Sequence, residues 1–196
     1  MMMTMSKIKS LVVDTTFLDA MYRLDLLENV TLLCDRVYVP ENVEKEFLND
    51  KNEDKDKRFS YLIKKFKKYR WLKKCNSYDK GVLLILSADK KIHLGESEVI
   101  AQVKQLGLGE LQEDFIIAVL DDRCARNSAE NMNIKKMGTL RVLAKFHLIF
   151  SIIDYYSKVD FLVKNGARFT RNVVRMVFEE VEKEILSGDL ELSESI

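Results

Sequence analysis

Acidic residues follow two apolar runs that lie far apart in the sequence. Asp14 comes directly after residues 11–13, and the pair Asp121 and Asp122 comes directly after residues 115–120. Clustered carboxylates that no Lys or Arg neutralises repel one another, so a cation is their natural partner. Hard divalent cations prefer oxygen ligands, and Mg²⁺ accepts one or two carboxylates while it keeps several waters. If the two runs are neighbouring strands, this arrangement predicts a divalent-metal site.

The elements around these acids alternate between strand and helix. The apolar runs predict strands at 11–13, 37–40 and 115–120, with one more short strand at 134–137. Helical spacing of apolar residues predicts helices after Asp14, over 41–48, from 95 to about 107 and through most of the chain beyond 139. This order predicts an α/β protein with three layers, α/β/α, around a central and mainly parallel sheet. In such sheets, ligands bind beyond the carboxyl ends of the strands.

Two glutamates on predicted helices are candidates for a third and a fourth carboxylate. Glu46 shares a helical face with Val43 and Phe47, so we expect it to point along the buried side, unlike Glu44. Glu98 lies in the first turn of its helix. Alternatively, an acid at a helix start only complements the helix dipole, and Glu46 is solvated. The spacing leaves both interpretations open.

The segment 51–74 is strongly basic, although the whole chain has a net charge of only +1. It holds eleven Lys and Arg residues against three acids. Its apolar residues fall on one helical face and its lysines, such as Lys64 and Lys68, on the other, which predicts an amphipathic helix inserted at about 51–80. This helix either contacts RNA phosphates or presents a solvated charged face. Residues 81–86 fit a buried strand or a short helix.

Several classes of protein are excluded by the remaining composition. The three cysteines are widely spaced without a C-x-x-C pair, which supports neither a disulfide framework nor a zinc site. Cys124 follows the acidic pair, yet no histidine lies near it in the sequence, so we expect a small buried residue. No stretch of about 18 apolar residues occurs, so we expect a soluble, cytoplasmic protein with no membrane contact.

Several short segments resemble one family in the right order. Residues 11–16 resemble the first strand of PIN domains, which ends in an Asp followed two residues later by Ser or Thr. Residues 38–46 are similar to the strand and helix that bear the second acid of that family. Residues 95–100, 120–126 and 138–143 are similar to a bacterial and archaeal subfamily of toxin-like PIN proteins. The resemblance covers about residues 9–150, which we interpret as a PIN-like domain, and 151–196 as a helical C-terminal extension.

The resemblance implies an endoribonuclease of the VapC toxin type, in which acids bind Mg²⁺ or Mn²⁺ and a metal-activated water attacks the phosphodiester. Carried onto this chain, the catalytic acids are Asp14, Glu46, Glu98 and Asp122. The metal ligands are Asp14, Glu98, Asp121 and Asp122, with Thr16 and Glu96 in support. The choice between Asp121 and Asp122 stays open because Leu120 stands where many relatives have Thr. The choice between Glu96 and Glu98 stays open because the resemblance only implies that the second Glu of the motif is the inward one.

The implied partners are an RNA substrate, an antitoxin protein and a second copy of the chain in a dimer. Arg123 and Arg126 are the nearest phosphate-binding candidates, with Lys64 and Lys68 on the basic helix. A haloacid dehalogenase phosphatase is disfavoured, because Thr16 stands where its Asp-x-Asp motif has the second Asp. The main alternative is a non-catalytic PIN-like module that binds RNA or a protein.

Overall fold

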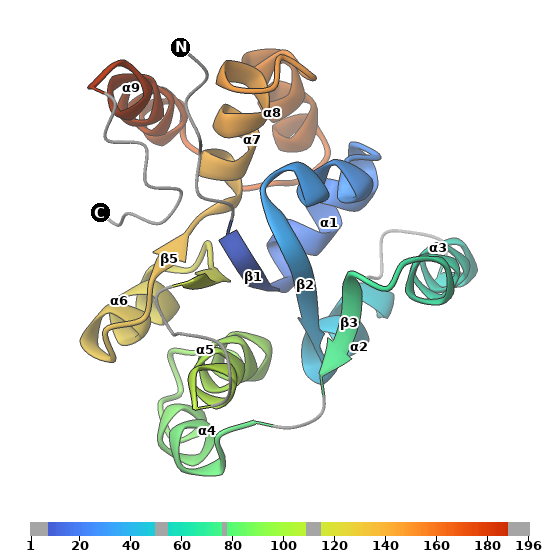
Figure 1. Cartoon of the computed structure of the whole chain (residues 1–196), viewed down its shortest axis with the longest axis vertical. Helices are drawn as coiled ribbons and strands as arrows, with labels where there is room; N and C mark the ends of the chain where they lie inside the picture. The colour runs from blue at the N-terminus through green and yellow to red at the C-terminus, as the bar shows by residue number, and fades with distance from the viewer. Residues whose placement is uncertain (1–7, 50–54, 76–77, 109–114, 188–196) are drawn as a thin grey trace.

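The computed structural model describes residues 8–49, 55–75, 78–108 and 115–187 (Figure 1). Their strands form one sheet in the order β3-β2-β1-β4-β5, and every pairing within it is parallel. The strands are β1 (Ile8–Val13), β2 (Cys34–Pro40), β3 (Leu72–Cys75), β4 (Ile116–Val119) and β5 (Lys136–Met137). The predicted α/β fold with a parallel sheet is confirmed.

Helices cover both faces of this sheet. They are α1 (Thr15–Arg23), the 3-10 helix η1 (Leu27–Leu32), α2 (Glu41–Leu48), α3 (Lys55–Lys68), α4 (Lys80–Ser87), α5 (Leu94–Gly107), α6 (Arg123–Asn131), α7 (Thr139–Leu148), α8 (Tyr155–Lys164) and α9 (Arg171–Ser187). In Figure 1, α4, α5 and α6 lie on one side of the strands and α1 and α3 on the other. The helices α8 and α9 pack on α7. No helix of the described ranges is both long and apolar enough to span a bilayer.

The strand order contains one switch point, between β1 and β4. The chain runs outward from β1 through β2 to β3, and then returns past β1 to build β4 and β5 on its other side. Because crossovers between parallel strands are right-handed, this reversal puts the connecting helices on opposite faces and leaves a crevice at the carboxyl ends of β1 and β4. The register pairs Val13 with Val119, so Asp14 and Leu120 leave the sheet side by side.

The structure assigns the secondary structure of the basic segment and of the residues that follow it. Residues 55–68 of the block form helix α3, as predicted, whereas 51–54 lie outside the described residues. The ambiguous residues 81–86 belong to helix α4, because Asp79 caps it by accepting a hydrogen bond from the N–H of Val82 at 3.0 Å. Only Leu86 is buried there, and Leu84 is 75% exposed, which no buried strand would allow. Strand β3, with two exposed lysines, was not predicted.

The C-terminal helices α8 and α9 are separated by a turn that contains a glycine. Gly166 has a φ of +100°, a left-handed conformation that glycine adopts without strain, and it separates α8 from α9. Helix α9 then packs along α7. The division of the chain into a domain at 9–150 and an extension at 151–196 stays a prediction.

Candidate functional site

Asp14 and Asp121 meet at the switch point of the sheet. Asp14 caps α1: its Oδ1 accepts the N–H of Phe17 at 2.8 Å, and its Oδ2 accepts the N–H of Asp121 at 3.0 Å. The Asp14 side chain is buried, and burial together with the charge of Asp121 raises its pKa well above the ordinary value, although the two amide hydrogen bonds lower it. These hydrogen bonds come from backbone amides, so they stabilise the carboxylate without neutralising its charge.

Asp121 is fixed by the residues that follow β5. It accepts hydrogen bonds from the N–H of Thr139, at 2.9 Å, and from the Thr139 hydroxyl. A Cβ on Gly138 would lie 2.9 Å from Oδ1 of Asp121 and 3.4 Å from Nη1 of Arg126, so only glycine fits without displacing the acid. Burial raises the pKa of Asp121, while Thr139 and Arg126 oppose the rise. The 138–143 motif therefore positions the acid that follows β4.

Asp122 and Glu96 face each other from two helix starts. Asp122 caps α6 by accepting the N–H of Ala125 at 2.9 Å. Glu96 accepts the N–H of His93 at 2.9 Å, at the start of α5. Burial, followed by the charges of Asp122 and Glu46, raises the pKa of Glu96, although the hydrogen bond from His93 lowers it. Asp14, Glu46, Glu96, Asp121 and Asp122 are called the acid cluster below.

Glu46 joins the acid cluster from the exposed side of α2. The prediction that it points along the buried side is wrong, because the buried acid of this helix is Glu44, which is 8% exposed and pairs with Lys74 at 2.8 Å. One residue is a rotation of about 100° on a helix, so Glu46 lies beside the core-facing Phe47 and opens toward solvent. Its Oε2 accepts the hydroxyl hydrogen of Thr15 at 2.5 Å.

Thr16 lines the cleft, and its supporting role stays a prediction. Its side chain is exposed, and the α1 hydroxyl that donates to an acid belongs to Thr15. Sequence reasoning missed Thr15 because the motif counts to the second residue after Asp14. Gly95 also contributes: a Cβ there would lie 3.0 Å from Oε2 of Glu46, so its absence lets α5 approach α2.

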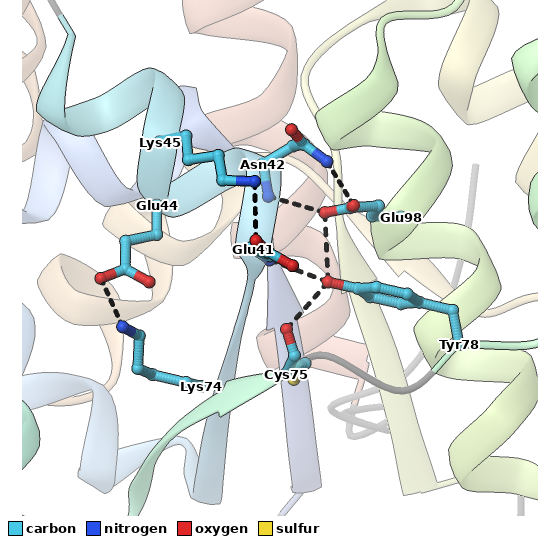
Figure 2. A network of polar contacts seen from close by, with 8 residues as sticks. All are labelled: Glu41, Asn42, Glu44, Lys45, Lys74, Cys75, Tyr78 and Glu98. Carbon is cyan, nitrogen blue, oxygen red and sulfur yellow. Dashed lines mark hydrogen bonds and ion pairs between the residues drawn. The ribbon is translucent and has the colours of Figure 1, made fainter.

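Glu98 lies apart from the acid cluster, in the network of Figure 2. It is 4% exposed; Oε2 accepts the N–H of Asn42 at 2.7 Å and lies 3.2 Å from the hydroxyl of Tyr78. Its Oε1 accepts the side-chain amide of Asn42. Residues two apart on a helix are about 200° apart, so Glu96 and Glu98 cannot face the same crevice. The structure brings Glu96 to the acid cluster, which corrects the placement of Glu98 there.

The acid cluster opens into a cleft of about 800 Å³. Its lining includes Glu46, Glu96, Asp121 and Asp122 from the acid cluster and also the segment 165–170 and parts of α9. The cleft therefore lies between the sheet edge and the C-terminal helices. The basic side chains that line it are Arg23, Arg58, Arg126, Lys136, Arg141 and Arg168.

Of the predicted RNA-binding residues, only Arg126 lines this cleft. Arg123 is exposed on α6 outside it, and Lys64 and Lys68 are exposed on α3. His93, which was not among the predicted site residues, lies in the cleft lining and is the N-cap residue of α5. Its position just before residues 95–98 was the signal that could have identified it.

Arg58 is a second charged feature of the cleft, and it is structural. The guanidinium is buried, pairs with Asp19 at 2.6 Å and donates to the carbonyl of Phe47 at 3.2 Å. It also lies over the rings of Tyr22 and Phe47. Asp19 binds Arg23 as well, at 2.6 Å. These opposite charges compensate each other, unlike the acid cluster, and they anchor α3 to α1 and α2.

The donor chemistry of the acid cluster fits a hard divalent cation. Its members supply carboxylate oxygens, and burial with mutual repulsion raises the pKa of Asp14 and Glu96, which a bound cation would reverse. Within the described ranges, no group of three or more His, Cys, Asp or Glu side chains is already arranged around a common ion position. Side-chain rotation of the more exposed acids would have to complete such a site.

Comparison with protein families gives a match over most of the chain. The family model described as DUF3368, a PIN domain, matches residues 10–183. The matched region runs from β1 into α9, so it includes the acid cluster and both sides of the cleft. A search of curated proteins finds no match.

Proposed function

Because the chain belongs to the PIN-domain family, whose members are generally nucleases, we propose that it is a metal-dependent endoribonuclease. The observation that carries the proposal is the acid cluster at the switch point of the sheet. Its carboxylates repel one another and open into a cleft that a polyanion can enter only if their charge is offset. A divalent cation offsets that charge.

Asp14, Asp121, Asp122 and Glu96 are the residues that would hold Mg²⁺ or Mn²⁺. When bound, the ion supplies positive charge for the phosphate and lowers the pKa of a water molecule. Asp14 is the innermost of the four, and its amide hydrogen bonds keep its orientation fixed. Asp122 and Glu96 are the more exposed members, so they can adjust to the ion.

The remaining residues of the cleft act on the substrate and on the attacking water. Glu46 lies in the cleft lining and is not one of the four proposed ligands, so its carboxylate can accept a proton from the attacking water. As the water oxygen bonds to phosphorus and the bond to the leaving sugar oxygen breaks, the proton of the water passes to the carboxylate. Glu46 is held by Thr15 on the same side.

The RNA strand would lie along the cleft between the acid cluster and the C-terminal helices. Arg126 lies beside Asp121, and Arg168 stands on the opposite wall, so both can contact phosphates next to the scissile bond. Arg123, Lys64 and Lys68 are exposed outside the cleft and would contact only flanking RNA.

Cleavage of a mixed pool of single-stranded RNA tests the proposal. Wild type is incubated with Mg²⁺, Mn²⁺ or EDTA, beside Asp14→Asn and Asp122→Asn. We expect cleavage with either metal, none with EDTA and little with either variant. Cutting that ignores EDTA, or that both variants retain, would refute the proposal.

Within this activity, we infer that the protein is the toxin of a toxin–antitoxin pair and acts as a dimer. The support is the similarity of residues 95–100 and 120–126 to toxin-like PIN proteins. Expression in bacteria should arrest growth with wild type and not with Asp14→Asn, and coexpression of the neighbouring gene product should relieve the arrest. Growth arrest by both proteins would contradict the toxin assignment. Sedimentation of the purified chain tests the dimer.

The basic helix favours a second candidate, a non-catalytic module that binds RNA. Helix α3 exposes Lys64, Lys67 and Lys68 away from the cleft, and Tyr69 stacks on Trp71 with ring centres 5.3 Å apart just after it. This module predicts RNA binding that Asp14→Asn leaves intact, with no metal-dependent cleavage. Loss of binding in Lys64→Ala with Lys68→Ala would support it, provided that wild type does not cleave.

A further inference from the structure

We propose that Glu98 is a positioning residue: from α5 it caps the start of α2, and it thereby fixes Glu46 relative to Glu96 in the cleft lining. The inference rests on the proposed nuclease function only for its kinetic consequence. Its structural content concerns how two helices that each bring an acid to the cleft are held together.

Helix α2 begins without a cap of its own. Its N-cap residue is Pro40, which has no side-chain acceptor for the free N–H groups of the first turn. Two of these groups are satisfied from elsewhere (Figure 2). The N–H of Glu41 donates to the hydroxyl of Tyr78 at 2.8 Å, and the N–H of Asn42 donates to Oε2 of Glu98 at 2.7 Å. Asn42 stands at the second helical position, where a capping side chain normally binds.

Contacts of the Asn42 side chain and of the Tyr78 hydroxyl also hold this cap in place. Asn42 also donates its side-chain amide to the other oxygen of Glu98, so both oxygens of the buried carboxylate are used. Tyr78 has a single hydroxyl proton, which the carbonyl of Cys75 attracts at 2.8 Å and Oε2 of Glu98 at 3.2 Å. The shorter contact links the start of α2 to the end of β3. A carboxylate suits this position better than an amide, because the helix start carries partial positive charge.

The contact transmits position to the acid cluster. Glu46 lies one turn beyond Asn42 on α2, and its carboxylate packs against Gly95, where a Cβ would be only 3.0 Å away. On α5, Gly95 and Glu98 lie three residues apart and face α2, whereas Glu96 lies between them in sequence and faces the cleft. The contact of Asn42 with Glu98 holds one end of this turn of α2, and the packing of Glu46 on Gly95 holds the other. Together these contacts set the separation of the Glu46 and Glu96 carboxylates.

Glu98→Ala and Glu98→Gln test this role, with Glu96→Gln as the matched loss of a proposed ligand. Tyr78→Phe removes only one hydroxyl and serves if Glu98→Ala does not fold. Three quantities are measured on each folded protein: hydrogen exchange at the Asn42 amide, the dissociation constant for Mn²⁺, and kcat and KM for RNA cleavage. The NMR signals of Gly95 and Glu46 report the position of the acid directly.

We expect Glu98→Ala to speed exchange at Asn42 about fivefold to tenfold, the effect of a lost cap. Its kcat should fall about tenfold to a hundredfold at unchanged KM, because a displaced group costs rate and not substrate binding. Glu98→Gln should restore most of both quantities. Neither variant should weaken Mn²⁺ binding as Glu96→Gln does.

Two results would overturn the inference. If Glu98→Gln weakens Mn²⁺ binding as much as Glu96→Gln, Glu98 is a ligand. If Glu98→Ala speeds exchange and leaves kcat and the signals of Gly95 and Glu46 unchanged, the cap is structural only. Should wild type cleave no RNA, the proposed function fails by itself; the inference then stands if Glu98→Ala shifts the Gly95 and Glu46 signals, and falls if it does not.

Discussion

The acid cluster and the interface between α7 and α9 both hold buried charge. At the interface, Arg141 pairs with Glu184 and lies 3.8 Å from Glu180, while Lys145 is fully buried. The Nζ of Lys145 has no hydrogen-bond partner within the described ranges. Burial, and then the charge of Arg141, lowers the pKa of Lys145 to about 8, although Glu184 opposes this.

The two regions differ in what can reach them. Burial disfavours the charged form of Lys145 and of Asp14 alike. The acid cluster lines a cleft, so a cation and a substrate can approach it, whereas Lys145 is sealed between helices. A destabilised charge therefore indicates a binding site only where it borders a cavity. Elsewhere it only lowers the stability of the fold.

The largest expected effect is on the activity of the acid cluster. Asp121→Asn keeps an acceptor for the N–H of Thr139 and removes one negative charge beside Asp14. Cleavage should fall about a thousandfold, because metal binding is lost, while thermal melting stays the same or rises as repulsion is relieved. Circular dichroism and a rate assay measure both. If Asp121→Asn melts at a lower temperature and still cleaves RNA, Asp121 stabilises the fold and is not needed for metal binding.

The opposite outcome is expected for Lys145→Met. Replacing a buried ammonium that lacks a hydrogen bond by an apolar chain of similar length should stabilise the fold by on the order of 2 kcal/mol at neutral pH, with cleavage unchanged. Urea denaturation gives the free energy of unfolding. A destabilised variant would show that Lys145 contributes favourably to the interface.

The same lysine predicts a pH dependence. Its pKa is lowered from 10.5 to about 8, so between these values the unfolded chain binds a proton that the folded chain has released. Stability contributed by this group is therefore lost as pH falls through about 8 and regained as pH rises toward 10.5. Wild type should gain stability relative to Lys145→Met over this interval, as seen in urea titrations at each pH.

Adding metal should distinguish the acid cluster from the α7–α9 interface, because only changes in the acid cluster should alter the stabilisation that the ion gives. The expected effect is smaller than those above. Mn²⁺ at ten times its dissociation constant should stabilise wild type by about 1.4 kcal/mol. Lys145→Met should keep this gain in stability, and Asp121→Asn should lose it. The shift in melting temperature on adding Mn²⁺ measures the gain for each protein. An equal gain in all three proteins would mean that the ion binds away from the acid cluster.

The smallest effect concerns the wall that the C-terminal helices contribute to the cleft. Arg168→Ala should raise KM about threefold at constant kcat. It should also reduce the slope of the logarithm of the binding constant against the logarithm of salt concentration by about 0.7, the share of one phosphate contact on a single strand. Lys64→Ala, outside the cleft, is the matched control. If Lys64→Ala has the same effects as Arg168→Ala, the RNA does not bind along the cleft.

Comparison of particular residues shows where the sequence was sufficient. The pairing of Asp14 with Asp121 and Asp122 was predictable, because a residue that ends a buried strand lies at the edge of the sheet whatever the helices do. Which neighbouring acid faces the cleft was not predictable for Glu44 against Glu46, or for Glu96 against Glu98. Residues two apart on a helix point about 200° apart, so which of the two faces the cleft depends on how the packed helix is rotated about its axis.

Except for β3 and α4, the sequence by itself determined the alternation of strands and helices, the parallel sheet and the family, because apolar periodicity and motif order are local properties of the chain. The tertiary structure decided that Glu96 joins the acid cluster, that Glu98 caps α2, and that residues 165–170 line the same cleft as the acids. Each of these depends on how helices rotate and pack against partners that are distant in sequence, and no local pattern records that rotation.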